Sequence, residues 1–359
     1  MKNSKKRECI GSSETTREPP HHSNFVFDDY RLHHCPDHAK NRFDQAFLEW
    51  FVGFSEGDGT FSYREEPQLR FLFEIGQKDP KILYKIRNIL GFGRVSFYTR
   101  DCASCAEQSS PLLPVRSKDS KDSKTNVVLF EKSKNSSSKA SPSSTSCAEQ
   151  GQEGQQKTYW RFSVEDKRGL QRIMSLFNGN LVLPKRQSQF KEWVLKGKRI
   201  QHPNFLLSDR KTFPSLETGW LSGFLEAEGC FYAGFTRPAQ RYTISSRLIQ
   251  KVTITQKDEA GEREILESIG QLLGSNSKLS LAKKPDSYRI ELSSLKSHQI
   301  IIFYMKKFPL QGEKGIAFRR WWRVYLFRVK KDHLTEKGIL KMRRLCRKIN
   351  ETAKEFQNE

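Results

Sequence analysis

The sequence predicts an α+β fold of two pseudo-symmetric domains, each with the order αββαββα and a four-stranded antiparallel sheet. Three observations lead to this prediction. Residues 51–59 (FVGFSEGDG) and 221–229 (LSGFLEAEG) share one unusual pattern, the order of the segments that follow recurs, and the strand segments alternate apolar with polar residues. A whole domain is therefore repeated within the chain.

Each of the two stretches reads as the last turns of a helix with small residues four positions apart. Gly53 and Gly57 form this pair in the first stretch, and Gly223 and Ala227 form it in the second. Small residues at this spacing leave a flat strip on a helix, and two such strips allow two backbones to approach closely. We expect the two helices to pack as a pair through these strips.

Each stretch also ends on a carboxylate followed by a glycine: Asp58 before Gly59, and Glu228 before Gly229. The carboxyl end of a helix is negatively polarised, so an exposed acid there costs roughly 0.3–1 kcal/mol. A bound cation would offset this cost. If the helices pair, the two acids lie beside each other at one shared site, and we expect both glycines to end their helices in the left-handed conformation.

The first half continues with two strands, a helix, two further strands and two helices. The helix is bounded by Asp79 as N-cap, Pro80 in the first turn and Gly91 as a stop. The last two strands can pair if the residues between them are looped out. The expected segments are strands at 60–63, 68–77, 92–98 and 158–164 and helices at 79–90, 167–177 and 185–198.

The second half repeats this order after its own motif helix. The expected segments are strands at 230–235, 247–256, 278–282 and 287–292 and helices at 258–273, 295–306 and 313–327. A further basic, leucine-bearing helix at about 335–354 either braces the core or contacts a partner, and its pattern leaves both roles open.

Composition sets the remaining boundaries. The first 43 residues lack periodicity, which is typical of a mobile arm. The stretch at 101–156 is rich in serine, lysine, glutamate and glutamine and cannot bury a core, so we read it as a low-complexity insertion. The expected division is a mobile N-terminal arm (1–43), a first domain (44–200), a linker (201–214), a second domain (215–328) and a basic C-terminal helix (329–359).

The charge of the chain indicates a polyanionic partner. Among 359 residues, 63 are lysine or arginine and 41 are aspartate or glutamate, which gives a formal net charge of +22. Nucleic acids and anionic membrane surfaces are the two candidate partners. No apolar run approaches the roughly 20 residues of a spanning helix, so we expect a soluble protein with no membrane partner.

The cysteines and histidines predict neither a disulfide nor a metal site. The seven cysteines are scattered, and the start of the chain lacks an apolar secretory segment, which indicates a reducing compartment. The cluster of His33, His34, Cys35 and His38 fits no standard zinc spacing. The CxxC pair at Cys102 and Cys105 lies inside the insertion, and we expect no metal or redox role for it.

These features together resemble the LAGLIDADG homing endonucleases in their two-motif, single-chain form. The resemblance rests on both motif copies and on the order of elements after each, and it covers about residues 44–328. It implies a monomer whose two sheets form a DNA-binding saddle and which cuts both strands of a long, asymmetric target. It also implies a role in intron mobility and an organellar location, in a chloroplast or a mitochondrion.

The resemblance implies a metal site at the second acid of each motif, which corresponds to Asp58 and Glu228. Backbone carbonyls just before these acids lie near the metal ions in relatives, so Gly57 and Ala227 are further candidate ligands. Oxygen ligands suit Mg²⁺, with other divalent cations such as Mn²⁺ as substitutes. Between two carboxylates and the scissile phosphates, divalent metal ions activate water and relieve charge on the leaving oxygen.

Four further positions match the active-site pattern of the family. Gln77 and Gln256 end the second strand of each half, where relatives place a polar side chain that orients active-site water. Lys185 and Lys314 begin a late helix in each half, where relatives place a basic residue near the cleaved phosphate. Because Arg186 follows Lys185 directly, this assignment can shift by one residue.

The remaining motif acids follow the family in a different way. Glu56 and Glu226 occupy positions that mostly support structure in relatives, so we do not expect them to be metal ligands. Glutamate at position 228 departs from the commoner aspartate. The family also contains this variant, and we expect activity to survive it.

The uncovered face of each sheet is the predicted DNA-binding surface. A two-stranded ribbon fits the major groove, where arginine pairs with guanine and glutamine with adenine. The alternative is a merely solvated face. The candidate DNA-binding residues are Arg64, Gln68, Arg70, Glu74 and Arg94 in the first half and Arg241, Arg247, Gln250, Lys251, Thr253, Lys278 and Arg289 in the second.

Two other functions stay open besides DNA cleavage. Some relatives are RNA maturases that help their own intron to fold, which would add intron RNA to double-stranded DNA as a partner. A DNA-binding regulator with the same fold is the third reading. Neither function needs paired acids, so the carboxylates at 58 and 228 favour cleavage.

Overall fold

The structure is a computed structural model that describes residues 25–39, 44–65, 69–100, 157–236, 247–275, 278–282 and 286–357. Contacts gather Met1–Tyr98 and Tyr159–Glu359 into one compact unit and separate Thr99–Thr158 from it. The predicted insertion at 101–156 with its CxxC pair, and the candidate residues Gln68 and Arg241, lie outside the described residues.

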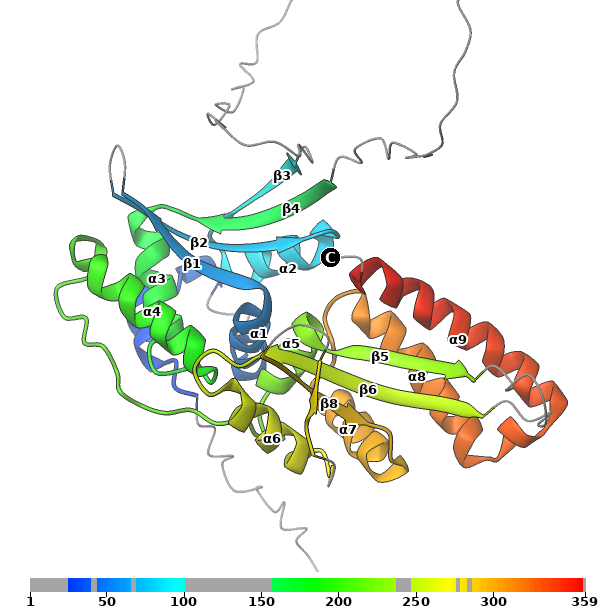
Figure 1. The fold of residues 1–359 in the computed structure, drawn as a ribbon. Coiled ribbons are helices and arrows are strands. Elements are labelled where there is room, and N and C mark those ends of the chain that lie inside the picture. Colours follow the sequence, from blue (N-terminus) through cyan, green and yellow to red (C-terminus); the bar gives the residue numbers. More distant parts are fainter. Residues whose placement is uncertain are drawn as a thin grey trace, which may run out of the picture. The chain divides into compact units, whose positions relative to one another are not determined.

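The two halves have the same topology, which confirms the predicted fold class (Figure 1). In the first half the sheet order is β1-β2-β4-β3, and in the second it is β5-β6-β8-β7. The first half contains α1 (Gln45–Asp58), β1 (Gly59–Arg64), β2 (Arg70–Gln77), α2 (Pro80–Leu90), β3 (Arg94–Arg100), β4 (Lys157–Val164), α3 (Lys167–Phe177) and α4 (Pro184–Lys196). The second half contains α5 (Trp220–Glu228), β5 (Cys230–Phe235), β6 (Leu248–Lys257), α6 (Glu262–Leu272), β7 (Ser280–Leu281), β8 (Ser287–Leu292), α7 (Leu295–Lys307) and α8 (Lys314–Val329).

Shorter elements and one long helix complete the described chain. Helix α9 (Glu336–Gln357) follows the second half. The short turns are the π-helical η1 (Tyr30–His34) and the 3-10 turns η2 (Asp37–Ala39), η3 (Lys198–Ile200) and η4 (Asp332–Leu334). No helix within the described ranges is both long enough and apolar enough to span a membrane.

Local sequence explains where the helices begin and end. The carboxylate of Asp79 accepts a hydrogen bond from the Lys81 amide at 3.1 Å, Pro80 occupies the first turn, and Gly91 ends α2 with a left-handed φ of 76°. Asp44 caps α1 in the same way, since its carboxylate accepts a hydrogen bond from the Phe47 amide at 2.7 Å. Backbone amides in the first turn of a helix have no acceptor within the helix, and these capping contacts supply one.

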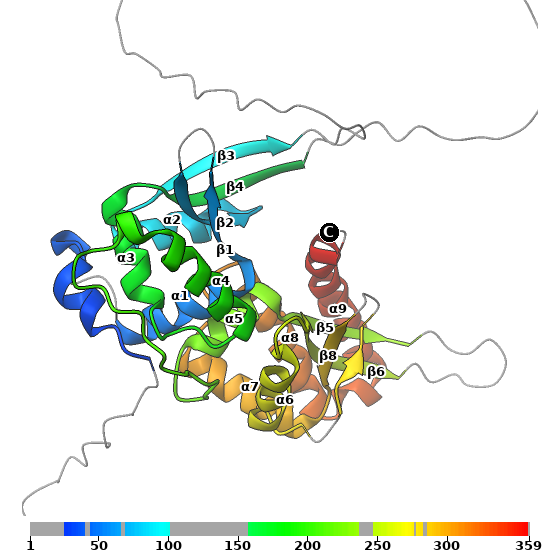
Figure 2. The same cartoon turned by 60° about the vertical axis from the view of Figure 1, so that its left-hand side comes forward.

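Each sheet is covered on one face, as the alternation of residues predicts. In β2 the side chains of Phe71, Phe73 and Ile75 are buried, while their neighbours at 70, 72 and 74 face the other way. In β6 Val252 and Ile254 are buried in the same manner. The helices lie against the buried face of each sheet, so one open face per half is left (Figures 1 and 2).

The glycines that end the motif helices do not adopt the predicted left-handed conformation. Gly59 has φ −87° and ψ 157°, and Gly229 has φ −72° and ψ 140°, both extended. Glycine is needed for a different reason, because the chain turns from helix directly into strand. A Cβ at Gly59 would lie 2.5 Å from the Ser55 carbonyl oxygen, and one at Gly229 would lie 2.6 Å from that of Leu225.

Part of the predicted mobile arm is instead built into the core. Phe25, Phe27 and Tyr30 are at most 3% exposed. The Asn180 side chain fixes this segment, since it accepts from the Val26 amide at 2.9 Å and donates to the Val26 carbonyl at 2.8 Å. The prediction of mobility is therefore wrong for residues 25–39, where aromatic burial outweighs the lack of periodicity.

Helix α9 braces the core of the second half, which is one of the two roles that its sequence left open. Met342, Cys346 and Ile349 are buried, and the helix lies along α8 and β5 (Figure 1). Basic side chains of both helices line a groove of about 230 Å³: Arg323 of α8, and Lys341, Arg344 and Lys348 of α9. Cys35, Cys230 and Cys346 form no disulfide within the described part of the chain.

Candidate active site

The two motif helices, α1 and α5, pack against each other through their small residues, as predicted (Figure 2). A Cβ added at Gly53 would lie 2.0 Å from the Trp220 carbonyl oxygen, and one added at Gly223 would lie 1.9 Å from that of Trp50. Since real Cβ atoms do not approach an oxygen so closely, only glycine permits this backbone contact.

The C-terminal ends of α1 and α5 bring the two motif acids close together. A Cβ at Gly57 would lie 2.2 Å from the Cβ of Ala227 and 3.2 Å from the Cγ of Glu228. Asp58 is the next residue along α1, and its carboxylate interacts electrostatically with that of Glu228. Both acids precede the first strand of their half, so they lie at the junction between the helix pair and the two sheets.

The environment of Asp58 is buried and partly neutralised. Burial raises the pKa of the Asp58 carboxyl to about 7, opposed by Lys314 and reinforced by the negative charge of Glu228. The side-chain amide of Gln77 donates a hydrogen bond to Asp58 Oδ2 at 2.7 Å, which places this candidate residue beside the acid, and its role in orienting water stays a prediction. Gln256 lies at the matching position of β6, and its side chain makes no hydrogen bond to another described residue.

The first acids of the motifs hold the loops that precede the late helices. Glu56 Oε1 accepts hydrogen bonds from the amides of Val182 at 2.7 Å and Leu183 at 2.6 Å. Glu226 Oε2 accepts from the amides of Gln311 at 2.7 Å and Gly312 at 3.1 Å. Both carboxylates are almost fully buried, and burial raises the pKa of each. Their structural role agrees with the expectation from the resemblance.

Helices α4 and α8, which follow these loops, each place one cationic side chain against the motif helix of the same half. Arg186 in the first turn of α4 donates to the carbonyls of Glu56 at 2.7 Å and Gly57 at 3.0 Å. Lys314, the first residue of α8, donates to the carbonyl of Ala227. In both halves a cation therefore binds the carbonyl just before the second acid, and burial lowers the pKa of the Lys314 ammonium.

Arg186, and not Lys185, is the counterpart of Lys314. The Lys185 ammonium pairs with Glu259 at 2.8 Å, and its backbone amide donates to Glu262 at 2.7 Å. The structure thus turns Lys185 toward the start of α6 and away from the two acids. The reason is helical geometry, because neighbouring residues on a helix point about 100° apart and only one of them can face α1.

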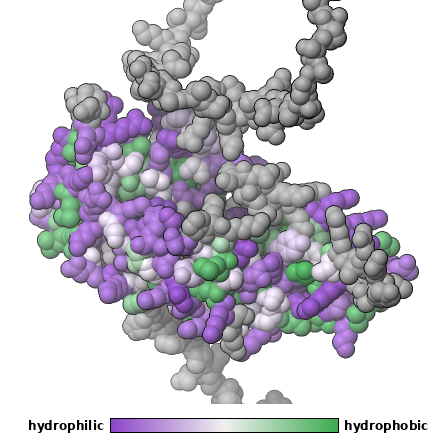
Figure 3. Space-filling model, in the orientation of Figure 1, coloured by the Kyte–Doolittle hydropathy of each residue, from purple (hydrophilic) through white to green (hydrophobic). Residues whose placement is uncertain are grey.

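Most of the predicted DNA-binding residues lie on the open faces of the sheets. The register pairs Arg64 with Arg70 on the first sheet and Thr253 with Glu291 on the second. Arg64, Arg70, Arg94, Arg247 and Lys278 are exposed, and Glu74, Lys251, Thr253 and Arg289 are partly exposed. The described surface in Figure 3 is mostly hydrophilic, with only scattered apolar patches.

Several of these residues are already paired within the sheets. Glu74 forms an ion pair with Arg161 at 2.7 Å, and Lys251 pairs with Glu291. Arg289 donates to the Thr255 hydroxyl at 3.2 Å. Such pairs fix the long side chains in position on the open face of the sheet, where they remain partly exposed.

Gln250 does not belong to the open face, which corrects the prediction. It is 2% exposed, and its amide donates to the Trp321 carbonyl at 2.8 Å on the side of α8. Adjacent strand residues point to opposite faces, so Gln250 and Lys251 cannot both face a partner. Strict alternation could have excluded Gln250 from the sequence alone.

The sequence reasoning missed an aromatic and basic group on the first sheet. The Arg161 guanidinium lies 4.5 Å from the centre of the Tyr98 ring, Tyr98 stacks on Tyr159 at 5.7 Å, and Arg161 donates to the Tyr159 hydroxyl at 2.8 Å. The alternation in residues 158–164 (TYWRFSV) places 159 and 161 on the open face. That pattern was sufficient to find them.

The donor set at the junction suits a hard divalent cation. It consists of the two motif carboxylates and the two carbonyls before them, all oxygen donors. The carbonyls already accept hydrogen bonds from Arg186 and Lys314, so each would offer a metal ion only its second lone pair. The acids are therefore the stronger candidate ligands.

Comparisons with known proteins give a consistent family. The model of the LAGLIDADG endonuclease family matches residues 221–325. A probable intron-encoded endonuclease 4 of Neurospora crassa is 26% identical over 85% of this chain, and an uncharacterized cox1 intron-2 protein of Schizosaccharomyces pombe is 22% identical over 87%. The chain spans 45% of the length of the Neurospora protein and 75% of the Schizosaccharomyces one.

Solved structures share the fold at low sequence identity. The LAGLIDADG meganuclease I-AabMI, bound to uncleaved DNA, is 18% identical with a TM-score of 0.54, and the alignment covers 84% of this chain and 98% of that one. The LAGLIDADG homing endonuclease I-LtrWI, bound to target DNA, is 18% identical with a TM-score of 0.57 over 85% and 98%. With two motif helices paired in a single polypeptide, the chain is similar in fold to these LAGLIDADG proteins, and residues 221–325 match the LAGLIDADG endonuclease family model.

Proposed function

We propose that the protein is a metal-dependent, site-specific endonuclease that cuts both strands of a long, asymmetric DNA target. The observation that carries this proposal is the pairing of α1 and α5, which brings Asp58 and Glu228 together beside two cations at the junction of two open sheets. A binding protein or a maturase needs no such pair of acids. The DNA-bound relatives of this fold support the same reading.

In the proposed reaction, Asp58 and Glu228 hold the divalent cation, Mg²⁺ by its preference for oxygen ligands. When bound, such a cation lowers the pKa of water and neutralises charge on phosphate oxygens. Gln77 keeps the Asp58 carboxylate oriented through its hydrogen bond. Because burial favours the protonated form of Asp58, a bound cation would also shift this acid toward its ionised form at neutral pH.

Arg186 and Lys314 provide fixed positive charge at the two sides of the acid pair. Each is held by a carbonyl of the motif helix of its own half, so little reorganisation is needed when negative charge develops on a phosphate nearby. The two halves would thus act on one strand each. This symmetry of acid, carbonyl and cation is the physical basis for proposing a cut in both strands by a single chain.

The open faces of the two sheets are the proposed DNA-reading surfaces. The exposed arginines at 64, 70, 94 and 247 and the Arg161 group supply cations for phosphates and donors for base edges. Affinity should fall steeply with salt, since each phosphate contact releases counterions. By analogy with the intron-encoded relatives, we infer that the chain is encoded in an organellar intron and acts on the intronless allele as a monomer.

The test is cleavage of DNA that spans the intronless junction of the host gene, with Mg²⁺ and purified protein. Asp58→Asn and Glu228→Gln should each abolish cleavage of both strands and leave DNA binding in Ca²⁺ within about threefold. Glu267→Gln, which removes an exposed acid that pairs with Arg263, serves as the control and should cut normally. Full cleavage by either motif variant would show that the acids are not the metal ligands.

A further inference from the structure

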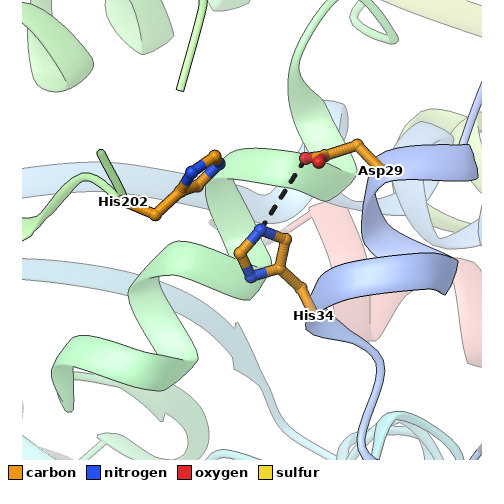
Figure 4. A group of neighbouring side chains, drawn as sticks. All are labelled: Asp29, His34 and His202. Atoms are coloured by element: carbon orange, nitrogen blue, oxygen red, sulfur yellow. Dashed lines mark ion pairs between the residues drawn. The ribbon is translucent and has the colours of Figure 1, made fainter. Parts of the chain in front are cut away.

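A second group of metal-binding side chains lies apart from the motif helices. Asp29 and His34 belong to the N-terminal segment, and His202 belongs to the connection between the two halves (Figure 4). Their ligand atoms all lie within 4.8 Å of one another. His34 Nε2 is 3.8 Å from Asp29 Oδ2, and the two imidazole rings are 4.8 Å apart between centroids.

The two imidazoles of this group each bury a nitrogen that lacks a hydrogen-bond partner. His34 Nε2 and His202 Nε2 are inaccessible to solvent, and neither has a partner among the residues that the structure describes. Buried polar atoms are rarely left unpaired in folded proteins, and those that are call for a ligand, a water or an ion. Here the two orphaned nitrogens and a carboxylate face the same point.

The local backbone is built to place Asp29 and His34 together. Turn η1 is π-helical, and the Cys35 amide donates to the Tyr30 carbonyl at 2.6 Å, five residues back. In this wider turn, residues five apart stack on one face, which brings the carboxylate over the imidazole. π-Helical turns are rare and are frequently found at functional sites.

We propose that Asp29, His34 and His202 bind a transition-metal ion of the zinc class. Two imidazoles and one carboxylate are a common protein ligand set for zinc, with water in the fourth position. Tetrahedral coordination at about 2.0 Å requires ligand atoms about 3.3 Å apart, so the side chains must close by roughly 0.5–1.5 Å, which small rotations supply.

Nearby cations limit the affinity of this site but do not block it. The Arg172 guanidinium donates to the His34 carbonyl at 2.8 Å and lies over the Phe92 ring, and His33 adds its imidazole nearby. Asp29 is the counter-charge. Because the nitrogen ligands come from the N-terminal segment and from the connection between the halves, the ion would fasten these two segments to each other.

The experiment uses the full chain with Cys102→Ser and Cys105→Ser, since these thiols offer a separate pair of zinc ligands. The protein is stripped with a chelator and titrated with Zn²⁺ by calorimetry and with Co²⁺ by visible absorption. We expect one bound ion, a Co²⁺ spectrum of nitrogen and oxygen ligands, and a zinc-dependent rise in Tm. His34→Asn and His202→Asn should each weaken binding at least about 10-fold.

The controls separate this site from its surroundings and from the proposed active site. His33→Asn removes the adjacent exposed imidazole, and Asp58→Asn removes a motif acid; both should bind zinc as the parent does. His202→Asn should retain Mg²⁺-dependent cleavage, so failure of the zinc proposal and failure of the nuclease proposal are distinguishable. If a histidine variant does not fold, Asp29→Asn gives the same comparison with a smaller change. Unaltered zinc affinity in these variants, or no binding by the parent, would overturn the proposal.

Discussion

Adding a methyl group at Gly57 in the motif-helix interface should destabilise the protein, and removing the facing methyl group of Ala227 should restore stability. A Cβ at Gly57 would lie 2.2 Å from the Cβ of Ala227, whereas carbon atoms in contact lie about 3.5–4.0 Å apart. Gly57→Ala must therefore push α1 and α5 apart or tilt them. Ala227→Gly removes the obstructing methyl group. The two substitutions together therefore keep the original volume, with the methyl group on α1 instead of α5.

The expected magnitudes follow from this overlap. Overpacking costs about 1–3 kcal/mol, and an overlap of more than an ångström between two backbones belongs at the upper end. Alanine gains about 1 kcal/mol over glycine in a helix, so Gly57→Ala should lose about 2 kcal/mol net. Ala227→Gly alone should lose about 1 kcal/mol. The double variant should lie near the parent, with an interaction energy of about 3 kcal/mol between the two sites.

Equilibrium urea unfolding of the four proteins, followed by tryptophan fluorescence and far-UV circular dichroism, measures this cycle. Gly53→Ala is the matched comparison, because its Cβ would meet the Trp220 carbonyl oxygen at 2.0 Å and Ala227→Gly cannot relieve it. Gly76→Ala is the benign control, with its nearest neighbour, a Tyr159 carbon, at 3.8 Å. The reasoning is refuted if Gly57→Ala is as stable as the parent, or if the double variant is no more stable than Gly57→Ala.

Three further predictions test the site. Arg186→Ala should slow single-turnover cleavage by about 100-fold or more, because a preorganised cation is lost. Lys185→Ala should cleave at a rate within a few-fold of the parent. The opposite ranking would favour Lys185 over Arg186 as the counterpart of Lys314. Gln250→Ala should lower the free energy of unfolding by about 1–2 kcal/mol through a lost buried hydrogen bond without changing DNA affinity, whereas Arg289→Ala should weaken binding in fluorescence anisotropy. Burial raises the pKa of Asp58 from 3.8 to about 7, so without metal the folded state binds this proton more tightly than the unfolded state does, and the free energy of unfolding falls as pH rises from about 4 to 7. In urea titrations between pH 5 and 8, Asp58→Asn should therefore lose less stability than the parent. Equal losses in the two proteins would argue against the raised pKa.

Local patterns were sufficient for most of the fold. The strands at 230–235 and 287–292 and the helix at 167–177 have the predicted bounds, because alternation and helical periodicity record which face is buried. The glycine stop of α2 was also predictable, since Gly91 has the left-handed φ that favours glycine. The arm at 25–39 was not, because a short aromatic segment without periodicity shows nothing of the surface that it covers.

The candidate site divides in the same way. Repetition of the motif identified Asp58 and Glu228 as a pair, and the family resemblance singled out Gln77, which the structure places beside Asp58. The choice between Lys185 and Arg186 depended on the rotation of α4 about its axis. That rotation is set by Glu56, which holds the amides before the helix from a position 126 residues earlier in the chain.

By itself, the sequence determined that a domain is repeated, where its helices and strands run, and that small residues and acids recur together at two helix ends. Those properties are local, since periodicity, capping and small side chains act within a few residues. Only the tertiary structure decided which cation faces the acids and that Asp29, His34 and His202 meet. These outcomes depend on which side chains from distant segments pack at the same place, and the spacing of residues along the chain does not show this.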